Sequence, residues 1–134
     1  MRSERFELET SGQRIWDITD RVRSFARDAG GDGLVHVFLP HATAGLALME
    51  TGAGSEPDLE DAIERLLPRD DRYRHSHGST GHGADHVLPA FIGPTLTLVV
   101  DDGQLDLGTW QSVVVVDTNA DNPRRTVRLT FLAG

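Results

Sequence analysis

The sequence contains no cysteine, which excludes disulfide bonds and thiolate metal sites, so any bound metal must be held by nitrogen and oxygen ligands. It has no apolar run long enough for a membrane span, and residues 1–10 lack the apolar segment of a signal peptide. The 13 basic residues are outnumbered by 21 acidic ones, and the net charge of −8 opposes binding to nucleic acid or to an anionic membrane. We therefore expect a cytoplasmic protein with neither nucleic-acid nor membrane partners.

Chain length and hydrophobic periodicity predict one α+β domain over residues 1–134. Strands are predicted over residues 4–9, 34–39, 45–49, 95–100, 109–117 and 126–132, with a short piece ending at 107, and helices over 18–29 and 57–67. Asp17 or Thr19 can cap the first helix, and Pro68 ends the second. The run Val113 to Val116 lacks polar alternation, which is typical of a strand buried on both faces. Two main helices among about seven strands indicate a mostly antiparallel, sandwich-like sheet.

Four of the six histidines lie in one glycine-rich loop predicted over residues 70–86: His75, His77, His82 and His86. Imidazole is the commonest protein metal ligand, and it titrates near neutrality. The loop is therefore either a ligand or catalytic loop, or a solvated loop whose histidines bind nothing. The spacing of the four histidines matches no standard zinc motif, so both interpretations stay open.

Further candidates lie at strand ends, where a rigid scaffold presents working side chains. His41 follows one predicted strand, and Glu50 ends the next. A short strand would separate the two by about 25 Å, so a bend or a neighbouring subunit is needed to bring them into one site. Asp61 is either part of a solvated helix face or points at the histidine loop.

Trp110 and Gln111 follow a tight turn, where the tryptophan either fills the core or forms the wall of a ring-binding pocket. Arg124 and Arg125 precede the last predicted strand. An arginine pair at a turn can clamp a phosphate group, although a solvated loop is the plainer interpretation.

Several elements occur in a recognisable order. They are PHATAGLALME, a helix ending in LLP, Y-x-H, D-H before LPAFIGPTLTLVV, LGTWQ and PRR. From about residue 5 to its end, the chain resembles the YjbQ family, also called uncharacterised family 0047 (UPF0047) or the secondary thiamine-phosphate synthase family. Met49 departs from the usual asparagine, Asp117 stands where glutamate is usual, and DTNADNPRR differs from the common acidic-Gly-Pro-Arg segment.

The resemblance implies a homotrimeric α+β protein with polar clefts between subunits and a weak thiamine-phosphate synthase activity. The positions that match the family motifs are His41, Glu50, Asp61, His75, His86, Trp110, Gln111 and Arg125 or, less closely, Arg124. His77 and His82 match no family position.

These matches assign three tasks to the candidate residues. His41, His75 and His86 are expected to bind a divalent metal, Zn²⁺ or Mg²⁺, while Glu50 and Asp61 are expected to be catalytic. The substrate, a small phosphorylated metabolite, is expected to contact Trp110, Gln111, Arg124 and Arg125.

Three functions are compatible with this set. The first is a thiamine-phosphate synthase-like transferase, which releases pyrophosphate. The second is a metal-dependent hydrolase of a small phosphorylated or ester substrate. The third is a non-enzymatic module that binds a metal or a metabolite.

Overall fold

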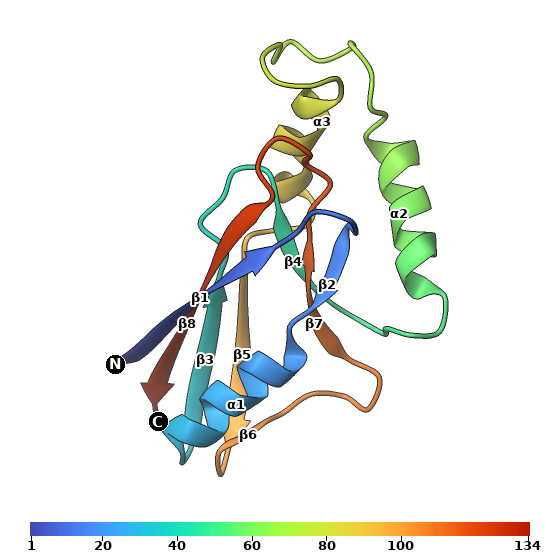
Figure 1. Cartoon of the computed structure of the whole chain (residues 1–134). Helices are drawn as coiled ribbons and strands as arrows, with labels where there is room; N and C mark the ends of the chain where they lie inside the picture. Colours follow the sequence, from blue (N-terminus) through green and yellow to red (C-terminus); the bar gives the residue numbers. More distant parts are fainter.

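Two antiparallel sheets form the framework of the computed structural model, which describes all residues from 1 to 134 (Figure 1). The larger sheet has the strand order β1-β8-β3-β5-β6 and the smaller one β2-β7-β4. Their bounds are β1 Arg2–Glu9, β2 Ile15–Asp17, β3 Gly33–Phe38, β4 Gly45–Met49, β5 Thr95–Asp101, β6 Gln104–Leu105, β7 Ser112–Val116 and β8 Arg124–Ala133. The predicted α+β class with antiparallel sheets is confirmed.

Strand β7 is buried on both faces, as its unbroken valine run predicts. Val113 and Val115 belong to the larger apolar cluster, between the two sheets and helix α1 (Thr19–Ala29). Val114 and Val116 belong to a second apolar cluster, on the other face of the small sheet. Because both faces of β7 are covered, this strand sits in the middle layer of the protein.

The large sheet and helix α1 cover one face of the small sheet, and helices cover the other. Helix α1 places Val22, Phe25 and Ala26 in the larger cluster. On the opposite face stands helix α2, which spans Ser55–Leu66 and buries Ile63 (Figure 1). None of the helices combines the length and the apolar character that crossing a bilayer requires.

Three departures from the predicted boundaries bear on the candidate site. The end of the predicted histidine loop is helical, because α3 begins at His82, runs to Val87 and is followed by the 3-10 turn η1 (Leu88–Ala90). Strand β7 begins at Ser112, since residues 108–111 form a turn closed by a hydrogen bond from the Gln111 N–H to the Gly108 carbonyl. Strand β8 begins at Arg124.

The early start of β8 overturns the expectation that Arg125 lies in a solvated loop. Its side chain is 1 % exposed. Nε and Nη2 donate to the two carboxylate oxygens of Asp117 at 2.7 and 2.9 Å, and Nη2 also donates to Thr43 Oγ1 at 2.8 Å. Thr10 Oγ1 donates to the same Asp117 carboxylate at 2.6 Å. The ion pair is therefore a buried joint between β1, β7, β8 and the segment before β4.

Replacing Arg125 by alanine should lower the free energy of unfolding by about 3–5 kcal/mol, because Asp117 would remain buried without its charge partner. The exposed neighbour offers a matched control, and Arg124→Ala should change the same quantity by less than about 0.5 kcal/mol. Urea denaturation of both variants at one fixed protein concentration measures the difference. Equal effects of the two substitutions would contradict the assignment of Arg125 to the folding core.

Candidate functional site

Helix α3 lies at one end of the molecule (Figure 1). Four histidine side chains meet there. This histidine cluster consists of His75, His77, His82 and His86. His75 and His77 come from the segment between α2 and α3, and His82 and His86 lie one turn apart in α3. One ring nitrogen from each residue lies within 4.8 Å of the others. The cluster is therefore small enough for its nitrogens to share one ligand.

His82 is the most firmly placed member. It is buried, and its Nδ1 lies 2.9 Å from Asp121 Oδ2 and 3.3 Å from Asn119 Oδ1. Its Nε2 lies 3.0 Å from Nε2 of His86. Acceptor oxygens beside Nδ1 place the ring hydrogen there, which leaves the Nε2 lone pair facing the centre of the cluster.

The segment that carries His75 and His77 has little apolar anchoring. From residue 70 to residue 80 no side chain is buried, and Tyr73 is half-buried. Asp121 accepts hydrogen bonds from the Ser79 N–H and hydroxyl, both at 3.0 Å. Polar contacts of this kind, rather than core packing, fix the path of this segment.

An ion pair closes the base of the same segment. Arg69 pairs with Asp85, which is fully buried, through both carboxylate oxygens, and Thr118 Oγ1 donates to Asp85 Oδ1 at 2.7 Å. A cavity of about 260 Å³ lies under the segment, and its walls include Tyr73, His75, His77 and His82. Gly78 has a positive φ of 83°, and a β-carbon there would lie 2.7 Å from His82 Cγ. Glycine at this turn therefore lets the chain pass close over His82.

The surroundings of His75 and His86 favour the neutral form of these two imidazoles. Loss of hydration lowers the pKa of His86, and repulsion from His75 and His82 lowers this pKa further. The pKa of His75 is lowered by the same two causes, with His77 and His82 as the repelling groups. At neutral pH His75 and His86 thus offer ring-nitrogen lone pairs rather than positive charge, which suits metal coordination or proton transfer.

His41 is not a member of the cluster. It lies between β3 and β4, and its Nε2 accepts a hydrogen bond from the Thr126 N–H at 2.9 Å. Loss of hydration lowers its pKa, as does the nearby positive charge of Arg125. Three histidines were expected to bind a metal. Within one chain, His75 and His86 belong to the same cluster, and His41 lies outside it.

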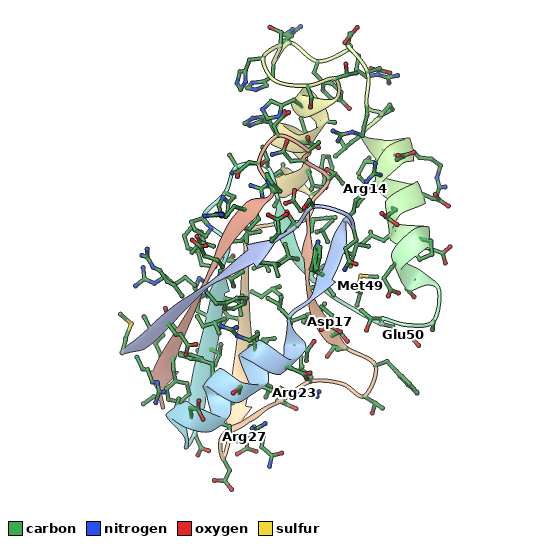
Figure 2. All side chains as sticks on the ribbon, in the orientation of Figure 1. Arg14, Asp17, Arg23, Arg27, Met49 and Glu50 are labelled. Atoms are coloured by element: carbon green, nitrogen blue, oxygen red, sulfur yellow. The ribbon has the colours of Figure 1, made fainter.

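Glu50, Trp110 and Gln111 lie at the opposite end of the small sheet. Strands β4 and β7 pair from Gly45 with Val116 to Met49 with Ser112. Glu50, which follows β4, and Gln111, which precedes β7, thus lie at the end of this strand pair away from residues 117–121. Both residues are exposed, and Figure 2 shows the position of Glu50. Trp110 is 72 % exposed, so it does not fill the core. The motif residues form two groups, one at each end of the β4–β7 pair.

The remaining candidates are separated from both groups. Asp61 is exposed on α2 and forms no ion pair, and the acidic residue beside it, Glu60, lines a different cavity. Arg124 is exposed on β8 opposite Glu9 of β1. Arg125 is held in the buried joint by Asp117 and Thr43.

A polar cavity of about 440 Å³ adjoins the histidine end. Its walls include Arg14, Glu60, Arg69, Thr118 and Asn119. Asn119 also contacts His82, and Thr118 and Arg69 both bind Asp85 in α3. The same residues therefore separate the cavity from the cluster, and the volume suits a small metabolite.

Sequence reasoning missed the contribution of His77 and His82 and of the acceptors Asp121 and Asn119. The family motifs exclude the two histidines, but the spacing H-x3-H places His82 and His86 on one face of a helix. That spacing was the available signal. No sequence pattern indicates that Asp121 and Asn119 contact the cluster. They do so because the β7–β8 connection folds back against His82.

In imidazole NMR titrations we expect the midpoints of His41 and His86 to lie below the ordinary histidine value of about 6.5. Because the unfolded chain then binds more protons than the folded one, the free energy of unfolding should fall as the pH drops through this range. Replacing His82 by alanine should raise the midpoint of His86, since it removes a repelling neighbour. A midpoint at or above the ordinary value would show that hydration is not lost.

Comparisons with known proteins agree with the family resemblance of the sequence motifs. A family model described as UPF0047 protein YjbQ-like matches residues 4–134. UPF0047 protein Rv2556c of Mycobacterium tuberculosis H37Rv is 62 % identical over 128 residues, which cover 96 % of this chain and 96 % of that protein.

Solved structures of similar fold include hypothetical protein APE1520 from Aeropyrum pernix K1. Its TM-score is 0.89, with 29 % identity over 100 % of both chains. The conserved hypothetical protein TT1486 from Thermus thermophilus has a TM-score of 0.84 and 30 % identity, covering 96 % of this chain and 99 % of its own.

Proposed function

The chain belongs to the UPF0047 family of YjbQ-like proteins, and we propose that its motif residues form one reaction site from two subunits of a homotrimer. The histidine end of one subunit would face the end of a neighbour that carries Glu50, Trp110 and Gln111. The observation that carries this proposal is the placement of these two groups at opposite ends of the β4–β7 pair. Tryptophan is enriched among the residues that carry the binding energy of protein interfaces, and the indole of Trp110 is exposed.

The donor atoms at the histidine end fit a divalent transition metal. His75 and His86 offer neutral imidazole nitrogens, which suit Zn²⁺, whereas Mg²⁺ prefers oxygen ligands. Bound there, such a metal would supply positive charge to a phosphoryl or carbonyl oxygen of the substrate. Of the two metals expected from the sequence, the histidine end thus favours zinc.

The substrate class is a small phosphorylated metabolite. The cavity beside the cluster has the volume for one, and its walls include Arg14 and Arg69, whose charges Glu64 and Asp85 partly neutralise. Trp110 of the neighbour would stack on a planar part of the substrate, and Gln111 would donate a hydrogen bond to it. Glu50 would accept the proton of the attacking group. Asp61 and Arg124 would not contact the reacting atoms.

Metal-dependent hydrolysis of a phosphorylated or ester substrate fits this arrangement best. The metal ligands offered at the histidine end are imidazole nitrogens, which suit the zinc of such hydrolases. Thiamine-phosphate synthase-like transfer is the second candidate. Its support is the match of Trp110 and Gln111 to the family motif, since an exposed indole can stack on a pyrimidine ring. A binding module without turnover is the third interpretation.

A complementation experiment tests the shared site. His86→Ala and Trp110→Ala subunits, each alone, should lose turnover of small phosphate monoesters or of the pyrimidine diphosphate and thiazole phosphate pair. Co-expressed with two different tags and purified as mixed trimers, the two variants should regain about one site in three, because one of the three contacts in such a ring joins an intact histidine end to an intact Trp110 end. Light scattering should give a trimer mass throughout.

Two matched variants control for general damage. His36→Ala removes a histidine that bonds Thr97 on the large sheet, and Phe91→Ala removes another exposed aromatic side chain. Both should keep turnover. A monomer mass at micromolar concentration would contradict the proposal, as would mixed trimers that remain as inactive as the separate variants.

A further inference from the structure

We propose that His77 and His82, the two cluster histidines outside the family motif, join His75 and His86 to form a four-imidazole metal centre within one chain. The centre would take Zn²⁺ or another nitrogen-preferring transition metal and reject Mg²⁺. This inference rests on the histidine end of the proposed reaction site and assigns its ligands without His41. Any substrate oxygen would then enter as an additional ligand beside the four nitrogens.

The distances within the cluster support one shared ion. Zinc binds imidazole nitrogen at about 2.0–2.1 Å, so the nitrogens around a tetrahedral ion are about 3.4 Å apart. The Nε2 atoms of His82 and His86 are 3.0 Å apart, and all four candidate nitrogens lie within 4.8 Å of one another. His75 and His77 are exposed, so small rotations of their side chains close the remaining gap.

The contacts behind His82 are those of a metal-binding histidine. Histidines that bind metals commonly donate the other ring N–H to a carboxylate or a carbonyl oxygen, which fixes the ring orientation. Here Nδ1 of His82 lies 2.9 Å from the Asp121 carboxylate, and Nε2 faces the cluster. Asp121 and Asn119 are therefore positioning residues, which act through His82.

A buried chain of hydrogen bonds connects this orientation to the folding core. Asn119 Oδ1 lies 3.3 Å from Nδ1 of His82, and its Nδ2 donates to Thr43 Oγ1 at 3.3 Å. Thr43 Oγ1 also accepts from Arg125, the centre of the buried ion pair. His82 is consequently held before any ligand arrives, which lowers the entropic cost of binding.

The weak anchoring of the preceding segment gives the metal a structural effect as well. No side chain from residue 70 to residue 80 is buried, yet two of its histidines meet two from α3. A metal bound by all four would tie this segment to α3 and restrict its opening. Arg72 and Arg74 lie in this segment and are exposed, so trypsin cleavage after them reports on that restriction.

The test is a titration of chelator-treated protein with Zn²⁺, and separately with Mg²⁺, in competition with a chromophoric chelator. The wild type should bind one Zn²⁺ per chain, and Mg²⁺ should not compete. His77→Ala and His82→Ala should each weaken Zn²⁺ binding by more than about 100-fold, and Asp121→Asn by about 10–100-fold, the usual effect of losing a carboxylate behind a metal-bound histidine.

His41→Ala and His36→Ala are the matched controls, and both should bind Zn²⁺ within about threefold of the wild type, because neither belongs to the cluster. Zn²⁺ should also slow trypsin cleavage after Arg72 and Arg74 in the wild type but not in His77→Ala. Since His77 is exposed, this variant should fold normally, which its circular dichroism spectrum would check.

One outcome separates this inference from the proposed function. If His41→Ala abolishes Zn²⁺ binding while His77→Ala and His82→Ala leave it intact, the motif histidines hold the metal, and only the four-imidazole centre is overturned. Wild-type protein that binds no Zn²⁺, or that binds Mg²⁺ equally well, also overturns it. Complementation between the two ends of different subunits tests the shared site independently of these titrations.

Discussion

The buried ion pair between Arg125 and Asp117 is the interaction on which the histidine end of this protein depends. Two charges removed from water remain stable only when every remaining donor and acceptor is satisfied. Here Thr10 and Thr43 complete the hydrogen bonding, and no buried side-chain polar atom of the structure lacks a partner. The pair fixes where β7 ends and β8 begins, and so the path of residues 117–123. That path brings Asn119 and Asp121 against His82.

The second constraint is the burial of β7 on both faces. A strand covered by apolar side chains on each side cannot present polar groups along its length, so chemistry is confined to its two ends. At one end the β7–β8 connection meets α3 and the histidine cluster. At the other, the β6–β7 turn exposes Trp110 and Gln111 beside Glu50. The division of the motif residues into two groups follows from this layering, and it is the observation behind the proposed pairing of two subunits.

Electrostatics shape what the histidine end can bind. The chain carries a net charge of −8, and the arginines that line the cavity beside the cluster are partly neutralised, Arg14 by Glu64 and Arg69 by Asp85. Lowered pKa values keep His75 and His86 largely uncharged at neutral pH. A phosphorylated ligand would therefore meet little free positive charge from side chains alone. A bound divalent cation would supply the charge that the side chains lack.

Patterns among residues close together in the sequence were enough to predict most helices and strands and to identify the family. The valine run marked β7 as doubly buried, and the LGTWQ and PHATA elements identified the family, because both depend on residues close together in the chain. Tertiary structure alone decided the fate of Arg125, since burial depends on Asp117 and Thr43 approaching it. It also decided the composition of the histidine cluster. His77 joins through the turn at Gly78, and His82 is oriented by Asp121, 2.9 Å from its Nδ1; neither contact can be read from local spacing, although H-x3-H does place His82 beside His86. His41 is retained elsewhere by the Thr126 N–H, a backbone donor from a strand 85 residues away in sequence.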